Sequence, residues 1–98
     1  MSVHILLEHP VPDYEAWKGA FDADPVHREA SGVRSYRILR PVDDPNYVAV
    51  ELEFADRERA GAFREALLAL WRSSAAQAVM RDPQIRIVEA VEARTYPG

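Results

Sequence analysis

Residues 47–54 read Tyr-Val-Ala-Val-Glu-Leu-Glu-Phe, a strictly alternating pattern of side chains. Every second residue from Val48 to Phe54 is apolar, and the positions between them are mixed. Because successive side chains of a β-strand point to opposite faces, this alternation predicts a strand with one buried face. Residues 33–40 predict a second strand, and residues 41–46 between the two carry prolines, aspartates and an asparagine, which are typical of turns. The stretch 33–54 therefore predicts a β-hairpin.

Two further strands are predicted at the ends of the chain. Residues 2–9 are rich in branched apolar side chains and are followed by Pro10 and Pro12, which cannot continue a central strand. Residues 85–93 repeat an apolar alternation near the C-terminus. We expect all four strands to join one antiparallel sheet.

Two helices are predicted between the strands. Asp13 is a good N-cap for a helix over residues 13–31, which carries an aromatic stripe and is interrupted near Asp24–Pro25. Gly32 can take the left-handed conformation that ends such a segment. Asp56 caps a longer helix over residues 56–80, whose apolar residues recur at helical spacing.

The order strand, helix, strand, strand, helix, strand is the ferredoxin-like βαββαβ plan of an α+β domain. Right-handed crossovers place both helices on one face of the four-stranded antiparallel sheet, so the other face stays bare. We expect this bare face to be mostly apolar, with Leu6, Tyr36 or Leu39, and Val88 or Val91 on it. A homodimer formed through the bare face is the predicted outcome. Residues 1–98 are predicted to form one domain.

The composition narrows the classes of function. The chain of 98 residues has a net charge of −4 and no cysteine. The charge argues against nucleic-acid binding, which depends on clustered Lys and Arg, and the lack of cysteine excludes disulfides and thiolate chemistry. We expect a cytoplasmic protein with no membrane association, because no stretch resembles a signal peptide or a transmembrane span.

The chain resembles the dimeric α/β-barrel superfamily, and within it the small proteins related to antibiotic-biosynthesis monooxygenases. The residues that carry the resemblance run over nearly the whole length; they are Val3–His9, Asp13–Lys18 with Phe21, Arg28–Val33, the turn Asp43–Asn46, and the phenylalanine-bearing second helix. The resemblance implies a ferredoxin-like dimeric α/β barrel. This superfamily includes cofactor-free oxygenases, haem-degrading enzymes and polyketide cyclases, so the resemblance does not select one activity.

Several residues that such relatives use are missing. Haem-degrading relatives carry an asparagine on the first strand, and residues 3–9 have none. Quinone-forming oxygenases use Asn, Trp and Tyr near a cavity, but Asn46, the only asparagine here, lies in a turn. The glycines are too scattered for a phosphate loop, and His4 and His9 lie on opposite faces of one strand. No cofactor and no metal site are predicted.

The candidate site residues are aromatic side chains and two polar neighbours. Trp17, Phe21, Phe63 and Trp71 are predicted to line a substrate cavity between helices and sheet; ordinary core packing is the alternative. His27 and Tyr36 are the predicted catalytic residues, which would move a proton at the cavity. A surface or capping role is the alternative for His27.

Two functions remain open from the sequence. The first is a small-molecule-binding protein that acts as a cofactor-free monooxygenase or cyclase on a hydrophobic aromatic compound. The second is a non-catalytic binding or structural homodimer, whose aromatic residues only fill the core. A cavity with a polar group pointing inward favours the first function, and a filled core favours the second.

Overall fold

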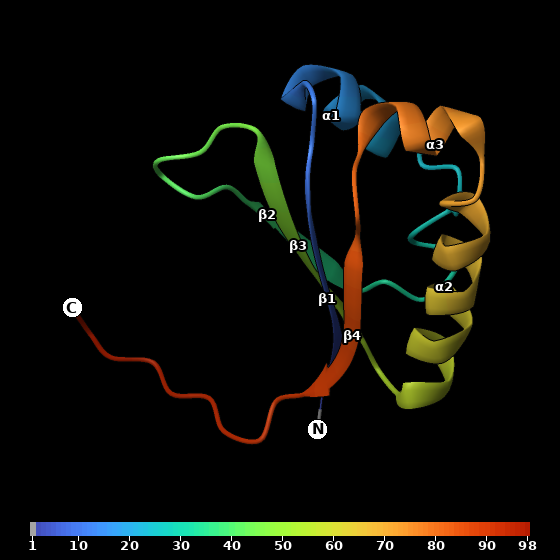
Figure 1. Cartoon of the computed structure of the whole chain (residues 1–98). Helices are drawn as coiled ribbons and strands as arrows, with labels where there is room; N and C mark the ends of the chain where they lie inside the picture. The colour runs from blue at the N-terminus through green and yellow to red at the C-terminus, as the bar shows by residue number, and fades with distance from the viewer. Residues whose placement is uncertain (1) are drawn as a thin grey trace.

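The computed structural model describes residues 2–98 and has the expected order of elements (Figure 1). These elements are β1 (Val3–Pro10), α1 (Tyr14–Asp22), β2 (Ser35–Leu39), β3 (Tyr47–Phe54), α2 (Arg57–Leu70), α3 (Ser74–Val79) and β4 (Gln84–Glu89). The α+β class and the ferredoxin-like plan are confirmed. No helix within residues 2–98 is long and apolar enough to cross a membrane.

The four strands form one antiparallel sheet in the order β2-β3-β1-β4. Ile5 at the middle of β1 lies between Leu52 of β3 and Ile87 of β4. Residues that lie opposite each other in a sheet share a face, so this register places the apolar series of β1 and β3 on the same side. The alternation read from residues 47–54 is confirmed, because Val48, Val50, Leu52 and Phe54 are all buried.

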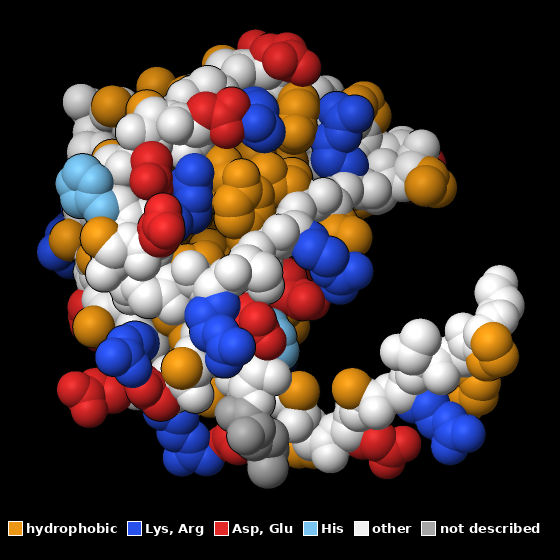
Figure 2. Space-filling view, turned by 180° about the vertical axis from the view of Figure 1, so that it is seen from behind, with side chains coloured by type: hydrophobic (Ala, Val, Ile, Leu, Met, Phe, Trp, Pro, Cys, Tyr) orange, Lys and Arg blue, Asp and Glu red, His pale blue; other side chains and the backbone are white. Residues whose placement is uncertain are grey.

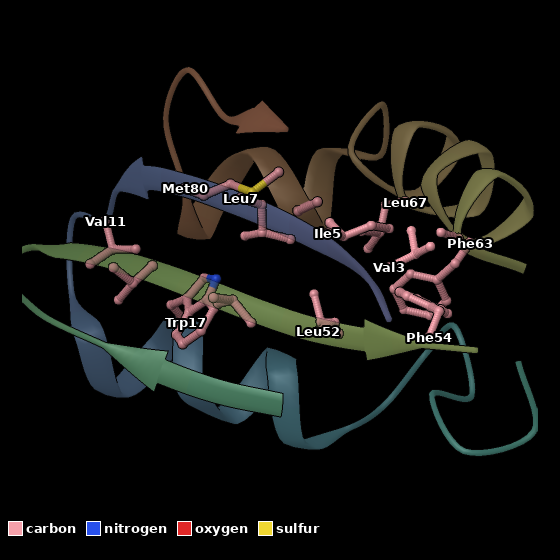
Figure 3. Packing of buried hydrophobic residues seen from close by; sticks show 14 residues of the cluster. Val3, Ile5, Leu7, Val11, Trp17, Leu52, Phe54, Phe63, Leu67 and Met80 are labelled. Atoms are coloured by element: carbon pink, nitrogen blue, oxygen red, sulfur yellow. The ribbon is translucent and has the colours of Figure 1, made fainter. Parts of the chain in front are cut away.

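All three helices lie on one side of the sheet, and the core fills the space between the two layers (Figures 1 and 3). Trp17 contributes to this core from α1, Phe63 from α2, and Ala76 from α3. At one end of the core the Phe63 ring packs against Phe54 of β3, with 5.4 Å between the ring centroids. The apolar stripe of each helix thus faces the apolar series of the sheet.

The first helix is shorter than predicted, because α1 ends at Asp22 and residues 23–34 form successive turns. Asp24 adopts a left-handed backbone with φ of 56°, and His27 does the same with φ of 51°. The ring of Pro25 disfavours a right-handed helical conformation at the residue before it, so a helix cannot run through Asp24. The Asp24 carboxylate accepts the backbone N–H of Arg28 at 2.9 Å and holds the turn instead. Gly32 takes the expected left-handed conformation, with φ of 98°.

The second predicted helix is divided into α2 and α3. Residues 71–73 separate the two helices, and the Ser73 hydroxyl accepts the backbone N–H of Ala76 at 3.1 Å as the N-cap of α3. This cap changes the direction of the chain and sets α3 beside α1 (Figure 1).

The helix-free face of the sheet is mixed rather than mostly apolar. The register puts Leu6, Leu39 and Val88 on this face, whereas Tyr36 lies opposite Leu52 on the helix side. Charged residues also lie on the face, and several of them pair within the chain: Arg37 with Glu51 at 3.2 Å, His4 with Glu53 at 4.0 Å, and Glu8 with the Tyr47 hydroxyl at 2.6 Å.

The last strand is also shorter than predicted. β4 ends at Glu89, and residues 90–98 run away from the body of the protein (Figure 1). The Ala90 N–H donates to the carbonyl of Ser2 at 3.1 Å and marks the end of sheet pairing. Val91 therefore lies in this segment and not on the bare face.

Candidate functional site

A cavity of about 280 Å³ lies between the helix-facing side of the sheet and the three helices. β1 and β3 supply its floor, and α1, the turns after α1, α2 and α3 supply its walls. Its lining is predominantly apolar, and a patch of hydrophobic side chains bordered by charged ones is seen from behind in Figure 2. An apolar concave space with a few polar groups is the usual form of a small-molecule site.

Aromatic side chains from α1 form one wall of the cavity. Trp17 and Phe21 are four residues apart, a spacing that places two side chains next to each other on one helix face. Their ring centroids lie 5.2 Å apart, and the Phe21 ring meets Tyr36 of β2 edge-on, also at 5.2 Å. Of these three residues, Trp17 and Phe21 line the cavity and offer apolar ring surface to a ligand.

Phe63 of α2 and Trp71, the residue that follows α2, also line the cavity. Phe63 is buried in the core and Trp71 is half-buried. The structure thus places Trp17, Phe21, Phe63 and Trp71 around the same space, as the sequence suggested. Their binding of a substrate remains a prediction.

His9 of β1 is a buried histidine that lines the cavity. Its Nδ1 lies 3.1 Å from the backbone carbonyl of Pro10, and a carbonyl can only accept, so Nδ1 carries the proton and Nε2 keeps its lone pair. Burial lowers the pKa of His9 from its ordinary value of 6.5, and the bond to Pro10 opposes this only in part. A neutral His9 at pH 7 can therefore accept a proton or a hydrogen bond through Nε2.

The His9 imidazole and the Trp17 indole bring two polar ring groups to the lining of the cavity. The two rings meet edge-on with centroids 5.8 Å apart, and both residues line the cavity. Within residues 2–98 no buried side-chain nitrogen or oxygen lacks a hydrogen-bond partner. The pair places one acceptor and one donor on an otherwise apolar wall.

Arg28 borders the cavity and stabilises the turn after α1. Its guanidinium carbon lies 3.8 Å from the centroid of the Phe21 ring, and Nη1 donates to the Phe21 carbonyl at 2.8 Å. The Asp24 carboxylate lies 3.5 Å from Nη1 and balances its charge. A cation beside the last turn of α1 also interacts favourably with the dipole of that helix. Arg28 thus holds the residues that form this edge of the cavity.

The two predicted catalytic residues do not line the cavity. His27 is exposed on the turn, and Tyr36, whose ring meets Phe21 edge-on, is 45% exposed and outside the cavity lining. Their catalytic role remains a prediction. The polar groups that the structure places on the cavity wall are those of His9, Arg28 and Ser73, with the indole N–H of Trp17.

His9 could have been identified from the sequence by the same alternation that located the strand. It occupies the position after Val3, Ile5 and Leu7 in the apolar series, so it is a titratable side chain on the buried face. The position of Arg28 carries no comparable signal, because it depends on the irregular turn. No group of three or more potential metal ligands occurs in residues 2–98.

Several solved structures resemble this fold. SnoaB from Streptomyces nogalater, described as a cofactor-independent oxygenase, has a TM-score of 0.75 and 15% identity, with 99% of this chain and 98% of that chain covered. A candidate antibiotic biosynthesis monooxygenase from Bordetella bronchiseptica has a TM-score of 0.67 and 17% identity, with 93% and 98% covered. A protein from an uncultured marine organism, described as dimeric ferredoxin-like, has a TM-score of 0.66 and 11% identity, with 95% and 98% covered.

These likenesses confirm that the chain has the fold of the antibiotic-biosynthesis-monooxygenase type within the ferredoxin-like α+β proteins. At such low identity they concern the fold alone. No family model matches the chain, and no curated protein sequence matches it.

Proposed function

We propose that this protein binds a hydrophobic aromatic small molecule in the cavity and acts on it as a cofactor-free monooxygenase or cyclase. The observation that carries the proposal is the neutral, buried His9 on the lining of an apolar cavity, with Nδ1 at the Pro10 carbonyl and the lone pair left on Nε2. A neutral histidine in such a position can take a proton from a bound ligand, which an apolar packing residue cannot do.

The cavity determines the class of ligand. A flat ring system would contact Trp17 and Phe21 and gain affinity mainly from burial of apolar surface. One hydroxyl group could donate to His9 Nε2, and one carbonyl group could accept from the Trp17 indole. A polycyclic phenol or phenolic ketone carries both groups.

In the oxygenase reaction His9 takes a proton from an acidic C–H or O–H group of the substrate, and the resulting anion reacts with dioxygen. Conversion of a ring CH₂ to C=O places one oxygen atom in the product and releases the other as water with the two hydrogens. The substrate supplies all four electrons. In the cyclase reaction the same proton abstraction creates a carbanion that attacks a carbonyl carbon of the same molecule. Both reactions begin with the same step at His9.

We also propose that the protein forms a homodimer through the helix-free face of the sheet. Its proposed location is the cytoplasm. The apolar residues Leu6, Leu39 and Val88 on that face would be buried against a second copy. Arg37 and Glu51 on that face already form an ion pair within the chain, which reduces the penalty for burying these two charges. A fold neighbour described as dimeric supports this assembly.

A non-catalytic binding or structural homodimer is the second candidate. The observation in its favour is that Trp17 and Phe63 belong to the continuous buried core, so they stabilise the fold without any ligand. This function requires no proton transfer at His9.

Oxygen uptake with a panel of polycyclic phenols and phenolic ketones tests the proposed activity. We expect uptake, or cyclised product by mass spectrometry, with the unaltered protein. His9→Asn should reduce turnover at least a hundredfold, because Asn can still donate to Pro10 but is a poor base. His27→Ala and Tyr36→Phe are tested in parallel: loss of turnover in either variant would support the role predicted from the sequence. Full activity of His9→Asn would refute the role of His9, and no product with any compound would favour the non-catalytic function.

A further inference from the structure

We propose that Arg28 forms a subsite for an anionic oxygen of the aromatic ligand at the edge of the cavity. The inference rests on the proposed function and deepens it, because it assigns a charge to the ligand and a place where that charge is held. The anionic oxygen belongs to a phenolate or to a carboxylate. Arg28 would contact the ligand directly, in addition to stabilising the turn after α1.

The first observation is the charge of the cavity lining. Within residues 2–98 the lining contains Arg28 but no aspartate or glutamate. The chain as a whole carries 16 acidic residues and 12 basic ones, so the lining reverses the balance of the composition. An arginine side chain keeps its positive charge at any physiological pH. An apolar cavity with one fixed cation favours a ligand that brings a negative charge.

The second observation is the way in which the guanidinium is held. The Arg28 side chain is only 15% exposed, and its guanidinium carbon lies 3.8 Å from the centroid of the Phe21 ring. Nη1 makes two polar contacts, with the Phe21 carbonyl at 2.8 Å and with the Asp24 carboxylate at 3.5 Å. A guanidinium has five N–H donors, so these contacts leave the three on Nε and Nη2 for a ligand. A side chain that is already held in place loses little freedom when it binds an anion.

The neighbouring carboxylate of Asp24 balances the charge of Arg28 only in part. Asp24 lies outside the cavity lining and its side chain is 38% exposed, so water screens its charge. The 3.5 Å from its Oδ1 to Nη1 exceeds the length of a strong charge-assisted hydrogen bond. The same oxygen also accepts the backbone N–H of Arg28 at 2.9 Å. An anionic oxygen on the cavity side can therefore pair with this guanidinium.

The third observation is the order of side chains along α1. His9 meets Trp17 with 5.8 Å between the ring centroids, and Phe21, four residues further along the helix, contacts Arg28. The imidazole and the guanidinium thus contact rings about one helical turn apart. A fused aromatic ligand that lies across Trp17 and Phe21 would place one substituent near His9 and another near Arg28. When His9 takes a proton, the conjugated rings spread the negative charge to an oxygen at the far end, where Arg28 pairs with it.

The ionisation of bound 2-naphthol tests the subsite. The phenolate absorbs at longer wavelength than the phenol, so an absorbance titration against pH gives the pKa of the bound compound. In the unaltered protein we expect this pKa to lie at least one unit below its value in water, because a nearby positive charge favours the ionised form. Arg28→Gln should remove this lowering. Arg28→Lys should retain part of it, since it keeps the charge but loses the planar set of donors.

Arg40→Gln is the matched control for the loss of a positive charge. The Arg40 guanidinium also lies over an aromatic ring of α1, 4.3 Å from the centroid of Tyr14, but Arg40 is outside the cavity lining. This variant should keep the full lowering of the pKa. Asp24→Asn leaves Arg28 in place and removes the competing charge, while its amide oxygen can still accept the Arg28 N–H. We expect it to lower the pKa of bound 2-naphthol further.

Binding of 2-naphthoic acid and of its primary amide distinguishes a carboxylate from a phenolate. The two compounds share the same rings, and only the acid is charged at pH 7. A carboxylate subsite predicts that calorimetry finds the acid bound at least tenfold more tightly than the amide, and that Arg28→Gln loses this preference. Either effect, if it is lost in Arg28→Gln, supports the subsite and identifies its anion.

Two outcomes would overturn the proposal, and they differ in what else they remove. If neither the pKa of 2-naphthol nor the preference for the acid depends on Arg28, the subsite is wrong while proton transfer at His9 still stands. If none of the three compounds binds the unaltered protein, the proposed ligand cavity fails together with the subsite.

Discussion

The protonation state of His9 is set by its position at the end of the buried series of β1. Water is largely excluded there, so the charged form loses its hydration and the pKa falls below 6.5. The contact with Pro10 then fixes which ring nitrogen keeps the proton. These two effects together give a neutral base with its lone pair on Nε2.

The lowered pKa of His9 predicts a pH-dependent stability. The unfolded chain binds a proton at this residue below about pH 6.5 while the folded chain does not, so the free energy of unfolding falls as the pH drops from 6.5 toward the lowered pKa. The slope is at most about 1.4 kcal/mol per pH unit for one proton. Urea unfolding of the unaltered protein and His9→Asn at several pH values measures it.

His9→Asn should show a shallower decline than the unaltered protein over this range. His27→Ala serves as the control, because it retains His9 and should keep the full decline. Equal pH dependence in all three proteins would contradict the proposed state of His9.

Gly32 is a second residue whose conformation decides what can replace it. Its φ of 98° strains any other residue, and a Cβ would lie 2.7 Å from Cδ of Arg59. Gly32→Ala should lower the free energy of unfolding by about 1–3 kcal/mol. Gly61→Ala is the matched control within α2: a Cβ there meets nothing within 4 Å, and the change should raise stability by about 0.5–1 kcal/mol. Denaturant unfolding measures both variants. An unchanged free energy of unfolding in Gly32→Ala would contradict the left-handed backbone of Gly32.

At the scale of elements, the strands were predictable because their alternation results directly from burial of one face. The hairpin at residues 33–54 is confirmed with β3 at its predicted bounds, and β1 differs by one residue at each end. The interruption predicted near Asp24–Pro25 is confirmed, because α1 ends at Asp22, but the predicted continuation of the helix to residue 31 is wrong. There Asp24 precedes Pro25 and takes a left-handed backbone, and the contacts of Arg28 with Phe21 and Tyr36 hold the turns that follow.

The break between α2 and α3 depends on the Ser73 cap. Ser73→Ala removes the oxygen that accepts the Ala76 N–H, so we expect a loss of about 1 kcal/mol in the free energy of unfolding. Ser74→Ala, at the next position and exposed, should change it by less than about 0.5 kcal/mol. Thermal and urea unfolding compare the two variants. Equal losses would show that the cap does not stabilise α3.

At the scale of the whole molecule, the helix-free face is a surface of the sheet that no helix covers (Figure 1). Leu39→Glu would place an unpaired charge in the proposed interface and should raise the dimer Kd roughly tenfold or more. Ala69→Glu, on the exposed side of α2, is the control and should leave the Kd unchanged. Sedimentation velocity over a range of concentrations measures both. A dimer equally stable in both variants would place the interface elsewhere.

The site was predictable only in part. Helix spacing and core packing place its aromatic residues, whereas the position of its polar groups also depends on the irregular turns after α1. Helical spacing brings Trp17 and Phe21 together, and the core layer adds Phe63 and Trp71. His27 is on the turn that replaces the expected helix, and the left-handed backbone there leaves its side chain exposed. The sequence therefore predicted the cavity wall and missed the buried histidine.

The most direct test of the account is a titration of the tryptophan fluorescence with a polycyclic phenol, because Trp17 and Trp71 both line the cavity. Ala76→Leu adds volume inside the cavity, and Ala78→Leu adds the same volume on the exposed side of α3. We predict saturable quenching in the unaltered protein and in Ala78→Leu, with a Kd at least tenfold weaker in Ala76→Leu. The same Kd in all three proteins, or no saturable quenching with any polycyclic phenol, would contradict a ligand site between the sheet and the helices.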